Sequence, residues 1–113
     1  MPATILVVEN HPDLRAEIQA ILQREHLDCD AVSSGDAALL KLREHDYRYV
    51  ILDVDGATAG KPVFEDLRAH GALAKLVLLT DSDETGEMPR SAAECAVLLK
   101  PFDGTQLLAR VRR

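Results

Sequence analysis

The chain has 113 residues, 47% of them hydrophobic, and this predicts one domain over residues 1–113 whose single core needs no disulfide or metal. The 13 basic and 19 acidic residues give a net charge of −6, which argues against nucleic acid as a direct partner, because phosphate backbones are bound by basic surfaces. No apolar run has the length of a membrane span, no signal-peptide layout opens the chain, and Cys29 and Cys95 fit no metal or redox motif; we therefore expect a cytoplasmic protein with both thiols buried and reduced.

The first half of the chain alternates strand and helix signals. The β-branched run 4–8 predicts a strand, and His11-Pro12-Asp13 predicts a helix start, because proline and acidic residues suit the first turn. Residues 27–32 predict a short edge strand, and Ser33-Ser34-Gly35-Asp36 supplies the N-cap of a second helix. Each helix has an apolar face, formed by Leu14, Ile18, Ile21 and Leu22 in the first and by Ala38, Leu39, Leu42 and the further candidate Leu40 in the second.

The central strand is predicted at 49–53, an uninterrupted apolar run that ends in Asp53 and is typical of a strand buried on both faces. A loop is expected at 56–60, followed by a helix marked by Val63, Phe64 and Leu67 and closed by Gly71. Further apolar runs at 76–80 and 96–101 predict strands, and a capping-box sequence at 103–106 starts a last helix whose apolar face is Leu107, Leu108 and Val111.

Strands that alternate with helices predict a parallel sheet with helices on both faces. One segment fits this pattern poorly. Residues 81–90 include Gly86 and Pro89 and have almost no apolar face, so the fourth of the expected helices is shortened or irregular, with a short helix at most around 90–94 and a mobile loop before it.

Polar side chains follow four of the expected strands: Glu9 and Asn10, Asp53, Thr80, and Lys100. In a parallel sheet the carboxyl ends share one edge, so these residues are expected to converge in a crevice. Glu9 and Asp53 have the oxygen ligands that Mg²⁺ prefers, Thr80 can donate to a phosphoryl oxygen, and Lys100 can neutralise another. Asp53 is the expected nucleophile, because carboxylates form aspartyl-phosphates and phosphoryl transfer depends mainly on positioning and charge neutralisation.

With these residues in this order, the chain resembles over essentially its whole length the response-regulator receiver domain of two-component signalling. The matching positions are Glu9, Asp53, Thr80 and the run Lys100-Pro101-Phe102. The resemblance implies a flavodoxin-like, doubly wound five-stranded parallel sheet of order 2-1-3-4-5 and a cis peptide bond between Lys100 and Pro101. It also implies a phospho-acceptor rather than an enzyme, with Mg²⁺ as cofactor, a histidine kinase or histidine phosphotransfer protein as donor and a further protein as downstream partner.

Several positions depart from the family pattern. Asn10 stands where the second acidic residue of the metal site is usual, so we expect weaker Mg²⁺ binding, which the carboxylate of Asp55 partly restores. Asp81 replaces the small residue after the threonine, and as an active-site gate it would oppose a phosphoryl group, although a solvent-facing loop residue is an equal reading. Val97 replaces the aromatic switch residue, so the usual coupling to Thr80 is not expected.

Other readings of these residues remain open. Asn10 serves equally well as the N-cap of the first helix, and His11, His26, His45 and His70 have no ligand spacing and are taken as surface residues. A degenerate receiver that binds a partner without phosphorylation is favoured by Asn10, Asp81 and Val97. A haloacid-dehalogenase-type phosphatase is suggested by the motif Asp53-Val54-Asp55-Gly56, but that family needs a further acidic pair beyond the lysine, where this sequence has only Asp103.

Overall fold

The structure is a computed structural model that describes residues 4–53, 60–70, 72, 75–80 and 96–111. Its centre is a five-stranded parallel sheet of order β2-β1-β3-β4-β5, which confirms the order implied by the family resemblance. The strands are β1 (Ile5–Val8), β2 (Cys29–Val32), β3 (Tyr49–Asp53), β4 (Leu76–Thr80) and β5 (Ala96–Leu99). The helices are α1 (Pro12–Arg24), α2 (Gly35–Glu44), α3 (Gly60–Ala69) and α4 (Gly104–Val111).

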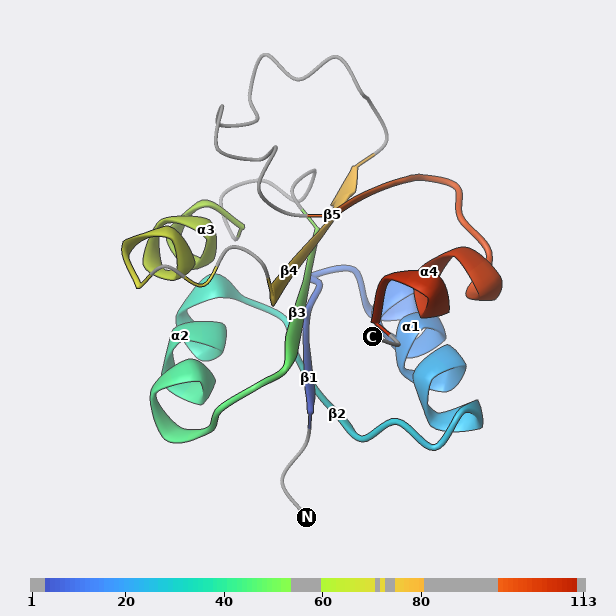
Figure 1. Cartoon of the computed structure of the whole chain (residues 1–113), viewed down its shortest axis with the longest axis horizontal. Helices are drawn as coiled ribbons and strands as arrows, with labels where there is room; N and C mark the ends of the chain where they lie inside the picture. The colour runs from blue at the N-terminus through green and yellow to red at the C-terminus, as the bar shows by residue number, and fades with distance from the viewer. Residues whose placement is uncertain (1–3, 54–59, 71, 73–74, 81–95, 112–113) are drawn as a thin grey trace.

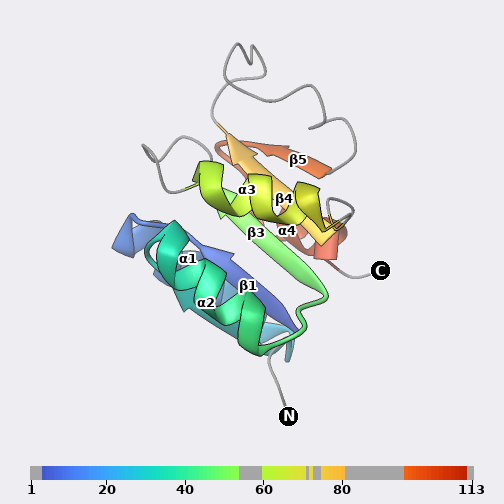
Figure 2. The ribbon, with the colours of Figure 1, turned by 90° about the vertical axis from the view of Figure 1, so that its left-hand side faces the viewer.

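The helices cover the sheet on both faces. Helices α1 and α4 lie on one face, and α2 and α3 lie side by side on the other (Figures 1 and 2). Along β1, Leu6 and Val8 belong to the core under α2 and α3, whereas Ile5 and Val7 belong to the core under α1 and α4. Every residue of β1 and β4 is buried for this reason, and this is why the strands are continuous apolar runs without polar alternation.

Side-chain caps define where three of the helices begin. Ser34 caps α2 by accepting a hydrogen bond from the Ala37 N–H at 3.1 Å, as predicted. The capping box of α4 is also confirmed: Asp103 Oδ1 accepts from the Gln106 N–H at 2.8 Å, and Gln106 Oε1 accepts from the Asp103 N–H at 2.9 Å. For α1, however, the N-cap is His11 and not Asn10, because Pro12 is the first helical residue and the cap is the residue immediately before it.

Two expectations about burial are wrong. Leu40 is 59% exposed and lies outside the apolar face of α2, of which Ala38 is the buried centre. Cys29 is a free thiol but only half-buried, because the strand that carries it is at the edge of the sheet. The expectations for Gly71, for the loop before Gly60, for residues 81–94 and for Cys95 lie outside the described residues. Of the helices in the described ranges, none has the length and apolar character needed to cross a bilayer.

The register of the strands places the polar residues at one edge. Val8 pairs with Leu52, so Glu9 and Asp53, which follow them, end neighbouring strands. Asp53 pairs with Leu79, and Thr80 pairs with Leu99, the residue before Lys100. The carboxyl ends of β1, β3, β4 and β5 thus bring the predicted site residues to a common edge.

A buried tyrosine ties the edge strand β2 to the segment that leads into β3. Tyr47 is 2% exposed and its hydroxyl donates to Asp30 Oδ2 at 2.5 Å. Burial and then this hydrogen bond raise the pKa of Tyr47, so the hydroxyl remains a donor at ordinary pH. The bond satisfies a polar group that would otherwise be desolvated in the core under α2 and α3.

Replacing Tyr47 by Phe should therefore lower the free energy of unfolding by about 1.5–3 kcal/mol, the usual value of a hydrogen bond to a charged group. Urea unfolding at neutral pH measures the loss. The matched variants are Asp30→Ala and the double variant, because a true Tyr47–Asp30 interaction makes the two single losses non-additive. Strictly additive losses, or an unchanged midpoint for Tyr47→Phe, would contradict this role of the hydroxyl.

Candidate functional site

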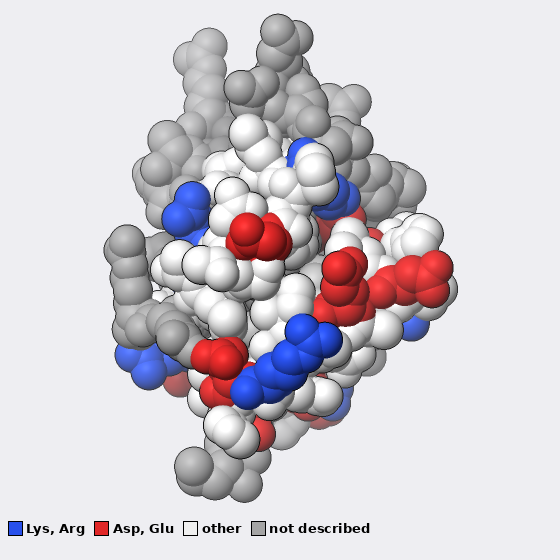
Figure 3. All heavy atoms as spheres, turned by 90° about the vertical axis from the view of Figure 1, so that its right-hand side faces the viewer, with Lys and Arg blue, Asp and Glu red and all other residues white. Residues whose placement is uncertain are grey.

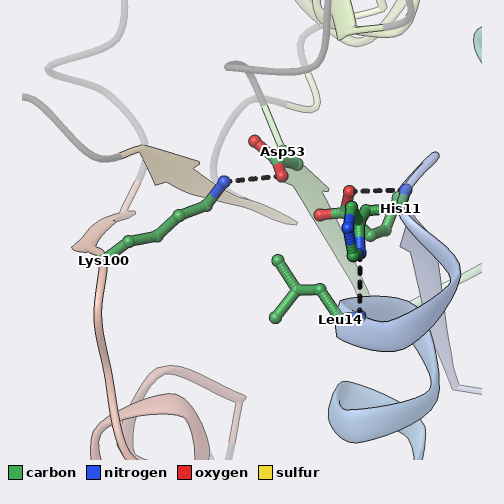
Figure 4. Close-up of polar contacts among 5 residues, drawn as sticks. His11, Leu14, Asp53 and Lys100 are labelled. Carbon is green, nitrogen blue, oxygen red and sulfur yellow. Dashed lines mark hydrogen bonds and ion pairs between the residues drawn. The ribbon is translucent and has the colours of Figure 1, made fainter.

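Asp53 ends the central strand with its side chain at the edge of the sheet. The residue is only 6% exposed, and Lys100 Nζ lies 2.6 Å from its Oδ2 (Figure 4). A buried carboxylate is costly unless it is paired, so the lysine compensates for much of the burial of Asp53. The structure thus brings together two residues that are 47 positions apart in the chain, as the strand-end argument predicts.

Lys100 is held in place through the neighbouring strand. Its backbone N–H donates to the carbonyl oxygen of Thr80 at 2.7 Å, which extends the pairing of β4 and β5 by one bond. The peptide bond between Lys100 and Pro101 is cis, as the resemblance implies. Thr80 is 3% exposed and ends β4 next to Asp53 in the sheet order, so all three residues assigned to phosphoryl chemistry lie at one edge.

Glu9 is the most deeply buried acidic side chain of the site, with 1% of its surface exposed. Its backbone N–H donates to the Val32 carbonyl oxygen at 3.0 Å, and its Oε1 accepts from the His11 N–H at 3.0 Å. Its Oε2 is buried and has no hydrogen-bond partner among the described residues. Such an unsatisfied, buried carboxylate oxygen is unusual in a folded protein, and its chemistry is suited to a positively charged ligand.

The protonation of Glu9 reflects the same shortage of positive charge. Burial, and after it the neighbouring Asp53 with its negative charge, together raise the pKa of this carboxyl from its ordinary 4.5 to about 7. The His11 N–H and the charge of Lys100 lower it but do not offset the burial. Glu9 and Asp53 are therefore near neighbours that repel each other when both are ionised.

The donor set fits a divalent cation. Glu9 Oε2 lacks a partner, Asp53 is adjacent, and both offer the oxygen ligands that Mg²⁺ takes. Over the described ranges, no group of three or more His, Cys, Asp and Glu side chains surrounds a common point, so these two carboxylates alone form the described part of the site. Asn10 is exposed on the turn after β1, while Asp55 and Asp81 lie outside the described residues.

The remaining predicted residues have distinct surroundings. Val97 is half-buried and packs against the core under α2 and α3, and Pro101 is exposed. All four histidines are exposed, as expected. One of them, His11, nevertheless contributes to the site, since its N–H holds Glu9 and its Nδ1 caps α1 (Figure 4). The position directly before Pro12 is the sequence signal that identifies this cap.

Comparison with known proteins now adds to the geometry. The sequence model of the response regulator receiver domain matches residues 5–112. The transcriptional regulatory protein CutR of Streptomyces coelicolor is 32% identical over 111 residues, which cover 96% of this chain and 51% of CutR. The DNA-binding response regulator MtrA of Mycolicibacterium smegmatis is 31% identical over 115 residues, covering 99% of this chain and 50% of MtrA. The chain therefore spans about half the length of these curated relatives.

A solved structure agrees over nearly the full chain. The response regulator TrrA from Thermotoga maritima, crystallised in complex with Mg²⁺ and BeF, is similar with a TM-score of 0.83. It is 29% identical, and the similarity covers 98% of this chain and 97% of TrrA. The strand order and the positions of the helices are thus those of a known fold.

The raised pKa of Glu9 predicts how pH acts on the metal-free protein. The carboxyl titrates near 4.5 when unfolded and near 7 when folded, so its contribution to stability is fully present below pH 4.5 and is lost as the pH rises through 7. Between pH 5 and pH 8, wild type should lose more stability than Glu9→Gln, by a few kcal/mol at most, since one pKa unit corresponds to about 1.4 kcal/mol. Urea unfolding in EDTA measures both.

Glu17→Gln on the exposed surface of α1 is the control, because it removes the same charge away from the site. This variant should follow wild type. If Glu9→Gln lost as much stability as wild type between the two pH values, the proposed titration of Glu9 would be wrong.

Proposed function

The chain belongs to the family of response-regulator receiver domains, and from this premise we propose that Asp53 is its phospho-acceptor and that phosphorylation switches a protein–protein interaction. The observation that carries the proposal is the pairing of Asp53 Oδ2 with Lys100 Nζ at 2.6 Å beside the buried, partnerless Oε2 of Glu9. In this arrangement the Asp53 carboxylate can act as the nucleophile, the Lys100 ammonium group supplies positive charge, and Glu9 Oε2 can bind a metal ion.

In the proposed reaction the donor is a phosphohistidine on a histidine kinase or a histidine phosphotransfer protein. A carboxylate oxygen of Asp53 forms a bond to phosphorus while the phosphorus–nitrogen bond breaks, and the imidazole leaves with the electron pair of that bond. Lys100 is already within hydrogen-bonding distance of Asp53, so its charge can offset the negative charge that gathers there. The Thr80 hydroxyl, at the end of β4, is the proposed donor to a phosphoryl oxygen.

Glu9 and Asp53 would hold Mg²⁺, with contributions proposed for Asn10 and Asp55. When bound, the ion would neutralise the charge of the two carboxylates and of the phosphoryl group. The amide of Asn10 offers an oxygen without a charge, so we expect a lower affinity than a second carboxylate would give. The Mg²⁺ and BeF bound to the similar protein TrrA are consistent with this proposed chemistry.

The switch is proposed to work without an aromatic residue. Val97 is half-buried against the core under α2 and α3, where its short apolar side chain has no ring or hydroxyl to exchange between two hydrogen-bonded positions. The output of this domain is thus proposed to use another surface or another conformational change than the threonine–aromatic coupling of the family. This argument does not depend on whether Asp81 acts as a gate, because the aromatic partner is already absent at position 97.

Two other functions are less well supported. A degenerate receiver is favoured by Asn10, Asp81 and Val97, but the buried Asp53 with Lys100 beside it retains the carboxylate and the cation that phosphoryl transfer would use. A phosphatase needs acidic residues after Lys100, and the Asp103 side chain instead caps α4 by accepting from the Gln106 N–H at 2.8 Å. We therefore propose a phospho-acceptor and not an enzyme.

The charge distribution supports proteins as the partners of this segment. On the face formed by α1 and α4, Lys and Arg side chains lie among Asp and Glu side chains, with no continuous basic stripe over the described residues (Figure 3). The net charge of −6 agrees with this pattern. Direct binding of nucleic acid is therefore not proposed for these residues, although MtrA, of which this chain matches about half, is a DNA-binding protein by name.

The proposed phospho-acceptor is tested by amide NMR with Mg²⁺ and then with beryllium and fluoride, which form an adduct resembling an aspartyl-phosphate that does not hydrolyse. Shifts at Asp53, Thr80 and Lys100 should appear in wild type and vanish in Asp53→Asn. Distant shifts would map the face that responds without an aromatic switch. If wild type gave no response at millimolar Mg²⁺ and beryllofluoride, the phosphorylation-independent module would be the better function.

Restoring the second acidic residue gives an independent test of the cation site. Asn10→Asp should tighten Mg²⁺ binding about tenfold, because affinity at oxygen sites rises with the number of ligand charges. A Mg²⁺ titration followed by amide shifts measures the affinity. The control is Asp13→Asn, an exposed residue of the first turn of α1, which should change the affinity little. Equal affinity of wild type and Asn10→Asp would remove Asn10 from the cation site.

A further inference from the structure

The turn between β1 and α1 is held by a residue that the family motifs do not include. Arg15, in the first turns of α1, donates from Nη1 to the carbonyl oxygen of Glu9 at 3.0 Å. Its own backbone N–H donates to the carbonyl oxygen of His11 at 2.9 Å. One residue therefore contacts the two residues on either side of Asn10, through its side chain at Glu9 and through its backbone at His11.

These bonds leave a single polar atom of Glu9 for a ligand. The Glu9 N–H is used by Val32, the carbonyl oxygen by Arg15, and Oε1 by the His11 N–H. Among the described residues, Oε2 is the polar atom of Glu9 for which no partner is found, and it is buried next to Asp53. Three hydrogen bonds thus fix the conformation of Glu9 and with it the direction of Oε2. Of these three, the bond from Arg15 is donated by a side chain of helix α1.

We propose that Arg15 is a positioning residue of the cation site, which sets the direction of Glu9 Oε2 by holding the Glu9 carbonyl oxygen. The inference rests on the proposed binding of Mg²⁺ by Glu9 and Asp53. Arg15 does not touch the cation or the phosphoryl group. It acts through the peptide that joins Glu9 to Asn10, and so it orients two of the residues that are proposed to contribute to the cation site.

An arginine suits this position for physical reasons. Its half-buried side chain crosses from the helix to the turn, and its planar guanidinium presents several N–H donors. A charged donor makes a stronger hydrogen bond to a carbonyl oxygen than a neutral one does.

The experiment is an amide NMR titration with Mg²⁺ of wild type, Arg15→Ala, Arg15→Lys and Arg24→Ala. Partners that orient metal ligands typically change metal affinity by 10–100-fold, so Arg15→Ala should weaken binding about tenfold. Arg15→Lys keeps a charged donor and should recover much of the affinity. Arg24→Ala removes the same charge from the exposed last turn of α1, and should bind Mg²⁺ as wild type does.

A second readout separates positioning from general stability. In the absence of Mg²⁺, hydrogen exchange of the His11 amide should accelerate in Arg15→Ala, because the bond to Glu9 Oε1 depends on the same turn. Exchange of core amides such as those of Ile51 and Leu78 should remain slow. Faster exchange throughout the sheet would show a structural role instead and would overturn the proposal.

The titration also distinguishes this proposal from the proposed function. If wild type bound Mg²⁺ and Arg15→Ala bound it with the same affinity, the role of Arg15 would be wrong while the cation site would stand. A wild-type chain that did not respond to Mg²⁺ at all would overturn the cation site, and the role of Arg15 with it. Weaker binding in Arg15→Ala with unchanged exchange at His11 would also contradict positioning through the turn.

Discussion

The site depends on the burial of two carboxylates at the ends of neighbouring strands. Glu9 is 1% exposed and Asp53 is 6% exposed, and each would be costly to ionise without compensation. Lys100 pairs with Asp53 and lowers the pKa of Glu9, yet burial and the neighbouring aspartate still hold that pKa near 7. The described residues therefore leave a shortage of positive charge at this edge, which a divalent cation is suited to correct.

The rest of the fold tolerates this unfavourable arrangement. The strands β1, β3 and β4, which end at the site, run between two helical layers, and β1 and β4 have no exposed residue. Burial of these apolar runs stabilises the fold and offsets the free energy cost of burying the carboxylates of Glu9 and Asp53. A ligand that binds only the folded state adds stability by mass action, so the proposed cation would stabilise the fold as it completes the site.

The strands, and the convergence of Asp53, Thr80 and Lys100 at one edge, were predictable because both follow from local sequence. Residues 76–80 are an apolar run that ends in a threonine, and β4 has these bounds. Parallel topology then brings Asp53 and Lys100 together without any knowledge of their contact. The strand order and the cis bond at Pro101 came from the resemblance, since a strand pattern alone does not fix the order of pairing.

Contacts between specific atoms were not predictable in the same way. Residue type favours Asn10 as the cap of α1, whereas the position directly before Pro12 selects His11, which is the observed cap. Leu40 follows two other apolar or small residues, so the pattern did not define the edge of the buried face of α2. The bond from Arg15 to the Glu9 carbonyl oxygen joins a side chain to a main-chain atom, and no sequence motif records such a pair.

The positions that match the family and those that depart from it affect different steps. Asp53, Thr80 and Lys100 are buried or half-buried at strand ends and linked by the Lys100 bonds to Asp53 and to the Thr80 carbonyl oxygen. Asn10 lies exposed on the turn beside the proposed cation site, and Val97 is half-buried against the core under α2 and α3. Departures at these two places are proposed to affect how strongly the cation binds and how the domain responds. They leave the proposed acceptor and its lysine in place, and this supports a phosphorylatable domain over a degenerate one.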